Sequence, residues 1–169
     1  MLIIRWLPSI ITILSMNLAI VSLYLVVNFD IRFSIMILII CAIMDWLDGF
    51  VARKLNVASD FGANLDSLAD LVVFVVNPSV VLAYHYQNKW VFLALMIYIS
   101  LGCIRLAKYD NTKSFFTGIP TPLAGLLMLV LVLFQSTYIP ISIVSVYIVI
   151  ASVAMVAPIR VKRILYKQS

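Results

Sequence analysis

Long apolar stretches fill most of the chain, and short polar segments divide them into six runs. Each run approaches the roughly 20 residues that a helix needs to cross the hydrocarbon core of a bilayer. The pattern therefore predicts six helices. They are expected over residues 6–28, 31–52, 63–86, 89–108, 119–136 and 138–158.

The composition indicates the same fold class. Hydrophobic residues make up 64% of the chain and charged residues 11%, and the mean hydropathy of +1.14 is far outside the range of soluble domains. At this length one domain is expected, residues 1–169. We predict an all-α, polytopic membrane protein, a bundle of about six transmembrane helices. The first helix has no convincing small-residue cleavage site after its basic start, so we expect it to be retained.

The basic residues gather on one side of the predicted bundle. With the amino terminus in the cytoplasm, ten of the twelve lie at cytoplasmic helix ends, and only Arg32 and Lys89 lie on the other side. This asymmetry follows the positive-inside rule and predicts a multi-pass protein of the cell membrane. The net charge of +5 then describes one face that meets anionic lipid headgroups, so it requires no nucleic-acid partner.

The acidic residues are concentrated in one segment. Five of the seven lie between Asp45 and Asp70, and the chain contains no Glu. Asp45 and Asp48 are three residues apart and Asp66 and Asp70 four apart, which places each pair on one face of its own helix. Carboxylates within a membrane helix are costly and are normally paired, cation-bound or functional. Because no matching group of bases lies on the same helices, the cluster predicts a divalent cation site.

The predicted topology brings the two acidic pairs together. The second helix runs towards the cytoplasm and ends near Arg53, so Asp45 lies about 12 Å from that end at roughly 1.5 Å per residue. The third helix starts near Gly62 on the same side, and the short loop 54–61 makes the two helices antiparallel neighbours. All four carboxylates are therefore expected to line one cavity that opens to the cytoplasm.

Small and polar residues near the carboxylates complete this cavity. Gly49, Ala52 and Gly62 let backbone or a ligand approach closely, although plain helix packing explains such residues equally well. Arg53 follows Gly49 by one turn, where its guanidinium can pair with a phosphate. The alternative for Arg53 is a topological role at the membrane edge. Ser59 precedes the third helix and is expected to cap it, to donate to a phosphate, or both.

These residues carry a resemblance to a known family. Residues 45–70 fit the pattern D-x2-D-G-x2-A-R-x8-G-x3-D-x3-D without a gap. The segment resembles the CDP-alcohol phosphatidyltransferase family, integral membrane enzymes of six helices that commonly form homodimers. The resemblance implies a two-metal site, with Mg²⁺ or Mn²⁺, that holds the diphosphate of a CDP-linked lipid while an alcohol displaces CMP. Phosphoryl transfer needs mainly positioning and charge neutralisation, and two cations supply both.

The same resemblance implies roles for individual residues. Asp45, Asp48 and Asp66 would be metal ligands, and Asp70 would bind metal and take the proton from the attacking hydroxyl. Contacts with the CDP-lipid are expected from Thr12, Gly49, Ala52, Arg53, Ser59 and Gly62. In the first helix, the members that use serine often have T-x-x-N where this chain has Thr12 followed by Ser15.

Further segments resemble the serine-using members of this family. The runs LDSLAD, RLAKYD and FFTGIPTPLAG are similar to their patterns. The resemblance implies CDP-diacylglycerol and L-serine as substrates, alongside membrane lipids. Arg105 and Lys108 are candidates to hold the serine carboxylate or a lipid phosphate, and a purely topological role is the alternative for both. Val75 and Asp110 depart from the pattern, because serine-using members usually have Gly and Asn there.

Two alternatives stay open. The same chemistry with glycerol 3-phosphate or inositol phosphate as acceptor would use an identical metal site. A cation transporter or channel would also carry carboxylates inside the membrane. Such a protein would not need Gly49, Ala52 and Arg53 at these spacings, which favours the transferase.

Overall fold

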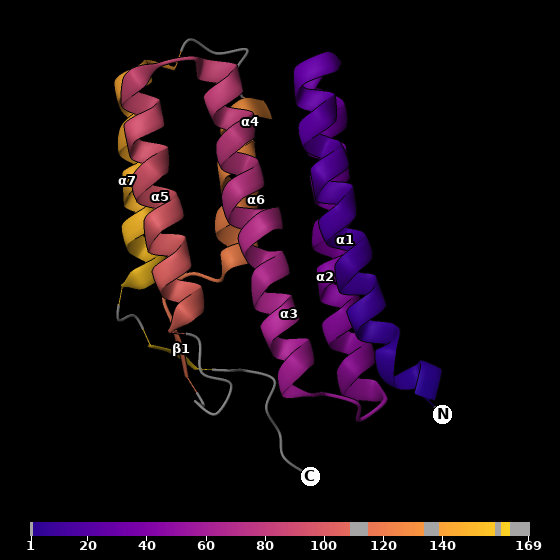
Figure 1. Ribbon diagram of the computed structural model, residues 1–169. Helices are drawn as coiled ribbons and strands as arrows, with labels where there is room; N and C mark the ends of the chain where they lie inside the picture. Colours follow the sequence, from indigo (N-terminus) through magenta and orange to yellow (C-terminus); the bar gives the residue numbers. More distant parts are fainter. Residues whose placement is uncertain (1, 109–114, 134–138, 158–159, 163–169) are drawn as a thin grey trace.

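The described part of the chain folds into a bundle of six helical rods (Figure 1). The computed structural model describes residues 2–108, 115–133, 139–157 and 160–162. The third rod consists of three consecutive pieces, of which the middle one, η1, is a π-helix. The helices are α1 (Leu2–Asn28), α2 (Ile31–Lys54), α3 (Asp60–Asp70), η1 (Leu71–Val76), α4 (Asn77–Tyr86), α5 (Lys89–Ala107), α6 (Thr121–Leu133) and α7 (Ile141–Val156). This architecture confirms the predicted fold class.

The predicted helix positions agree with the structure to within a few residues. The third rod begins at Asp60 instead of residue 63, and the last helix begins at Ile141. The end expected for the fifth helix falls on residues 134–136, outside the described residues. Within the described ranges, four rods are long and apolar enough to cross a membrane, and α6 and α7 are shorter apolar helices. Several apolar helices of this kind make the chain a multi-pass membrane protein.

Polar residues at the junctions determine where the rods begin. Asp30 Oδ1 accepts a hydrogen bond from the backbone N–H of Arg32 (2.9 Å) and caps α2. Asn88 caps α5 in the same way through the N–H of Trp90 (2.9 Å). The turn between α2 and α3 contains Asn56 with φ of +52°, a conformation that Asn adopts more readily than most residues. This tight turn makes α2 and α3 successive antiparallel rods, as predicted.

Two helix pairs flank the central rod. α1 packs along α2, and α5 packs along α7, with the α3–η1–α4 rod between the two pairs (Figure 1). α6 contacts both η1 and α4. Large apolar side chains such as Tyr24, Ile43 and Phe92 are exposed on the outer faces, as expected for surfaces that contact lipid. The central rod thus connects the two halves of the bundle.

The π-helix η1 packs very closely against α5 and α6. The hydroxyl of Tyr98 donates to the Phe74 carbonyl (3.0 Å), which satisfies a backbone group at a point where the regular α-helical pattern is interrupted. A Cβ at Gly125 would lie 2.6 Å from the Phe74 carbonyl oxygen, and one at Gly102 would lie 2.8 Å from Cγ1 of Val75. Glycine on α5 and on α6 therefore permits the contact. Val75, where the chain departs from the family pattern, occupies the space over Gly102.

Directly after η1, Asn77 joins the central rod to α1. Its side chain is fully buried. The amide nitrogen donates to the Ser22 hydroxyl (2.9 Å) and to the Ala19 carbonyl, and the amide oxygen accepts from Ser22 (3.0 Å). Polar side chains that bond across helices stabilise membrane bundles, so Asn77 fixes which face of α4 is turned towards α1.

The sequence did not predict a short strand pair near the ends of α5 and α7 (Figure 1). β1 (Phe115–Thr117) pairs antiparallel with β2 (Arg160–Lys162). Gly118 follows β1 with φ of +76°, and a Cβ there would lie 2.1 Å from the carbonyl oxygen of Met155. Glycine is required by both the backbone angle and the close approach. The contact attaches the segment before α6 to the end of α7.

Candidate metal and substrate site

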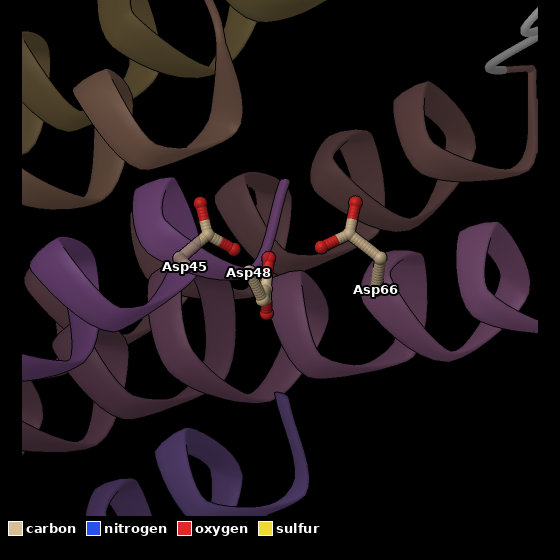
Figure 2. Close-up of side chains that lie close together, drawn as sticks. All are labelled: Asp45, Asp48 and Asp66. Atoms are coloured by element: carbon tan, nitrogen blue, oxygen red, sulfur yellow. The ribbon is translucent and has the colours of Figure 1, made fainter. Parts of the chain in front are cut away.

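Three of the predicted metal ligands converge between α2 and α3. Asp45 and Asp48 project from α2 and Asp66 from α3, and each offers a carboxylate oxygen within 4.8 Å of the other two. Figure 2 shows the carboxyl groups of Asp45 and Asp66 directed towards each other, with Asp48 between them. Asp48 is buried, and the other two are half-buried. α2 and α3 both pack against α1, and this arrangement brings carboxylates from two different helices together.

Asp70 adjoins this cluster from one turn further along the central rod. It is the last residue of α3, and its carboxyl group lies within hydrogen-bonding reach of Asp45. Its Oδ1 atom is buried and has no hydrogen-bond partner among the described residues. A buried carboxylate oxygen without a partner is costly. A cation or a substrate hydroxyl would remove that cost.

The set of ligand atoms suits a hard divalent cation. Oxygen ligands are those that Mg²⁺ and Mn²⁺ prefer. Carboxylates within 4.8 Å of one another repel strongly unless positive charge lies between them. The Asp70 oxygen that has no partner within the described ranges adds a further ligand atom beside the cluster. These residues therefore fit a metal centre.

A cavity of about 400 Å³ opens beside the carboxylates. The residues predicted to contact the CDP-lipid all line it: Thr12, Gly49, Ala52, Arg53, Ser59 and Gly62. The Thr12 hydroxyl donates to Asp48 Oδ2 (2.6 Å) and so joins α1 to the acidic cluster. Pro8 and Ser9 also line the cavity, and the sequence pattern did not single them out. The signal that could have identified them is the proline one turn before Thr12 in an otherwise apolar helix.

Arg53 places its guanidinium next to Gly49. A Cβ at Gly49 would lie 3.2 Å from Nη1 of Arg53, so a side chain at this position would compete with the guanidinium for space. At the opposite helix, Ser59 Oγ accepts from the N–H of Gly62 (3.1 Å), which confirms the predicted cap of α3. A hydroxyl that accepts in this way keeps its own proton to donate. The start of α3 therefore offers a hydroxyl donor and the positive end of a helix dipole to an anion, and the Asp60 carboxylate in the same turn offsets part of this attraction.

A second, smaller cavity of about 200 Å³ shares Asp66 with the first. Asp70 and Arg105 line it together with the first residues of α6. Nη1 of Arg105 donates a hydrogen bond to the Thr121 hydroxyl. Of the two bases predicted to bind the acceptor, Arg105 thus lies at a cavity with Asp70. Lys108 is exposed at the end of α5 and is not among the described residues that line this cavity.

Thr121 is a residue of this smaller cavity that the sequence pattern did not identify. It stands between Pro120 and Pro122, which indicate the start of a helix and no more. Its contact with Arg105 depends on how α6, packed on η1 and α4, places its first residue beside the end of α5, and no local spacing shows that placement. Asp110, where the chain departs from the family pattern, lies outside the described residues.

Comparison with known proteins agrees with the motif that α2 and α3 carry. Residues 5–158 match the CDP-alcohol phosphatidyltransferase family. The chain therefore belongs to that family. The family is generally metal-dependent, which agrees with an aspartate cluster that can hold a cation.

Several curated relatives are named CDP-diacylglycerol–serine O-phosphatidyltransferase. The chain is 40% identical to the one from Methanocaldococcus jannaschii over 99 residues, which are 57% of this chain and 48% of the relative. It is 34% identical to the Bacillus subtilis relative over 144 residues, 81% of this chain and 79% of the relative. It is 32% identical to a Helicobacter pylori relative over 139 residues, which are 78% of this chain and 59% of the relative. The chain thus spans about half the length of the archaeal relative and about four-fifths of that from Bacillus subtilis.

Proposed function

We propose that the protein is a metal-dependent CDP-diacylglycerol–serine O-phosphatidyltransferase of phospholipid biosynthesis. It would transfer the phosphatidyl group from CDP-diacylglycerol to L-serine and release CMP. The observation that carries the proposal is the position of Asp66 at both cavities, with Arg53 at the larger and Arg105 at the smaller. The names of the relatives from Methanocaldococcus jannaschii and Bacillus subtilis support serine as the acceptor.

The larger cavity suits the CDP part of the donor. The guanidinium of Arg53 lines this cavity, and a guanidinium binds phosphate oxygens through parallel N–H donors. The start of α3 behind the Ser59 cap adds the positive end of a helix dipole. Gly49, Ala52 and Gly62 leave room for a ligand to approach the backbone. Thr12 holds Asp48 in place from α1 through its hydrogen bond.

The four aspartates are proposed to hold two cations, Mg²⁺ or Mn²⁺. Bound cations would neutralise the charge that develops on the diphosphate during transfer. Asp45, Asp48 and Asp66 supply oxygens within 4.8 Å of one another. Asp70, beside Asp45, contributes at the edge of the smaller cavity.

Asp70 is the proposed general base. The serine hydroxyl oxygen forms a bond to the phosphorus that carries diacylglycerol, and the bond from this phosphorus to the CMP oxygen breaks. CMP leaves with that oxygen, and phosphatidylserine is formed. The hydroxyl proton moves to a carboxylate oxygen of Asp70, whose buried Oδ1 has no other partner among the described residues. The cavity that Asp70 lines gives the hydroxyl access to this oxygen.

The smaller cavity suits serine better than a larger acceptor. Its volume of about 200 Å³ lies below the roughly 300–1,000 Å³ of typical pockets for drug-sized ligands. Arg105 would bind the serine carboxylate, and Lys108 at the exposed end of α5 would attract anionic substrates. Glycerol 3-phosphate and inositol phosphate carry a phosphate of about two negative charges. Arg105 is the one base among the described lining residues, which favours the singly charged carboxylate.

We infer that this site faces the cytoplasm of a cell membrane. Arg53, Lys54, Arg105 and Lys108 lie at the ends of α2 and α5, and both helix ends are on the side of the bundle that holds the α2–α3 turn (Figure 1). An excess of bases on that side is typical of cytoplasmic ends. The proposal includes a single domain of residues 1–169. It also includes a homodimer, which the family resemblance implies.

CMP release by the purified protein tests the acceptor. With CDP-diacylglycerol and Mn²⁺ or Mg²⁺, we expect turnover with L-serine well above that with glycerol 3-phosphate or inositol phosphate. Chelation of the metal should abolish it. Faster release with glycerol 3-phosphate would overturn the serine assignment, and full activity in excess chelator would overturn the metal site.

A further inference from the structure

We propose that Thr121 is a positioning residue for acceptor recognition. Its hydroxyl holds the Arg105 guanidinium at the wall of the smaller cavity, in the orientation that receives the acceptor carboxylate. The inference deepens the proposed function and rests on it, because it assumes that this cavity takes serine. Thr121 is not one of the residues that the family motif in α2 and α3 contains.

The hydrogen bond between Arg105 and Thr121 joins two helices at the cavity wall. Nη1 of Arg105, on the last turn of α5, donates to Oγ1 of Thr121, the first residue of α6. Thr121 is fully buried, and Arg105 is half-buried. Both line the cavity that contains Asp70. The contact therefore lies at the acceptor site and not on the outer surface of the bundle.

The backbone around Thr121 is held rigidly. Prolines at 120 and 122 fix φ on both sides of it, and the Pro120 carbonyl accepts from the N–H of Ala124 (3.0 Å) in the first turn of α6. The N–H of Ile119 donates to the Ala154 carbonyl at the end of α7 (3.1 Å). The Thr side chain itself is restricted at χ1 because it is branched at Cβ. The hydroxyl is thus a fixed point for Arg105.

A fixed guanidinium matters because a carboxylate binds best to the planar fork in one orientation. Arginine has a long side chain that loses considerable rotamer freedom when it is held. If Thr121 holds it before the substrate arrives, less of that cost falls on binding. The bond also keeps the positive charge of Arg105 close to Asp70. This closeness is needed because the serine hydroxyl must reach Asp70 while the serine carboxylate contacts Arg105. The contact would therefore affect acceptor affinity more than donor affinity.

A plain structural role for the hydroxyl makes a different prediction. If the bond only ties α6 to α5, its loss lowers stability and turnover without a preference between substrates. If Thr121 positions Arg105, its loss raises the KM for serine selectively. The two roles are separated by measuring the KM for serine, the affinity for CDP-diacylglycerol and the melting temperature of each variant.

The experiment compares Thr121→Val, which keeps the shape but loses the hydroxyl, with Thr121→Ser, which keeps the hydroxyl. We expect Thr121→Val to raise the KM for serine about tenfold, the effect of one hydrogen bond to a charged group, with an unchanged affinity for CDP-diacylglycerol. Thr121→Ser should stay within about twofold of the wild type. Ser100→Ala is the matched control, because this hydroxyl on the same helix as Arg105 donates to the Met96 carbonyl of its own turn.

A double variant tests whether Thr121 acts through Arg105. Thr121→Val in an Arg105→Ala background should give no further rise in the KM for serine. A full additional tenfold rise would overturn the positioning role, and so would an unchanged KM in Thr121→Val. If Thr121→Val does not fold, Thr121→Ala against Thr121→Ser gives the same comparison. Absence of serine-dependent CMP release in the wild type would instead overturn the proposed function, so the two failures are distinguishable.

Discussion

Substitution of Asp66 by Asn provides a test of the metal cluster that does not depend on activity. Asp66 has two carboxylate neighbours, Asp45 and Asp48, within 4.8 Å. Without metal, each such pair of charges costs about 0.9 kcal/mol in a medium like water and about 3.5 kcal/mol at an effective dielectric constant of about 20. The cavity opens to solvent, and Arg53 offsets part of the repulsion. We therefore take the lower limit, about 2 kcal/mol for the two pairs.

Loss of this repulsion should make the metal-free protein more stable. For a chain of this size, about 2 kcal/mol corresponds to a rise in melting temperature of roughly 4–8 °C. The same substitution removes a ligand, so added Mn²⁺ should stabilise Asp66→Asn much less than it stabilises the wild type. The opposite signs of these two effects distinguish a metal site from four unrelated polar side chains.

Thermal unfolding of purified protein in detergent, with EDTA or with Mn²⁺, measures both effects. Asp30→Asn is the matched control, because Asp30 is an exposed carboxylate that caps α2, and Asn caps a helix about equally well. This control should keep the full stabilisation by Mn²⁺. The reasoning is refuted if Asp66→Asn leaves the metal-free melting temperature unchanged and still gains as much from Mn²⁺ as the control.

Two further predictions concern binding and packing. Asp70→Asn should lower kcat for CMP release by about 10²-fold or more, with little loss of CDP-diacylglycerol affinity. Arg53→Ala should instead weaken that affinity, because the phosphate that Arg53 binds is already present in the ground state. Calorimetry with the donor lipid decides this, and an unchanged affinity for Arg53→Ala would return the residue to a topological role. Gly125→Ala should lower the melting temperature by several degrees, since its Cβ would lie 2.6 Å from the Phe74 carbonyl oxygen; an unchanged melting temperature would show that α6 can move away from η1 at no cost.

Hydropathy was sufficient to predict the helices, and local spacing was sufficient for most of the site. The spacing of Asp45 and Asp48, with the short turn before α3, places these side chains beside Asp66 once the two helices are antiparallel. Ser59 caps α3 because it stands directly before the helix, a signal that is wholly local. These features depend on neighbours in the sequence, and sequence patterns record such relations well.

Features that depend on distant parts of the chain were not predictable in this way. Thr121 meets Arg105 only because the packing of α6 on η1 and α4 places the start of α6 beside the end of α5. Tyr98 donates a hydrogen bond to the π-helix, and glycines on two other helices permit its close packing, so the run LVVFVV alone predicts an ordinary α-helix. The strand pair of residues 115–117 with 160–162 joins segments far apart in the sequence. In each case tertiary packing determines the local structure. Apolar residues of similar size give no sequence pattern that would distinguish one packing arrangement from another.

The π-helix also sets a rule for exchanging sequence between relatives. Asp70 before it faces Asp45, and Asn77 after it bonds to Ser22 on α1. Deleting or inserting one residue in between would rotate one end of the rod against the other by about 100° and shift it by about 1.5 Å. One of the two contacts would then be lost. A chimaera that exchanges the central rod must therefore keep the number of residues between Asp70 and Asn77, and its junctions belong in the loops at either end of the rod.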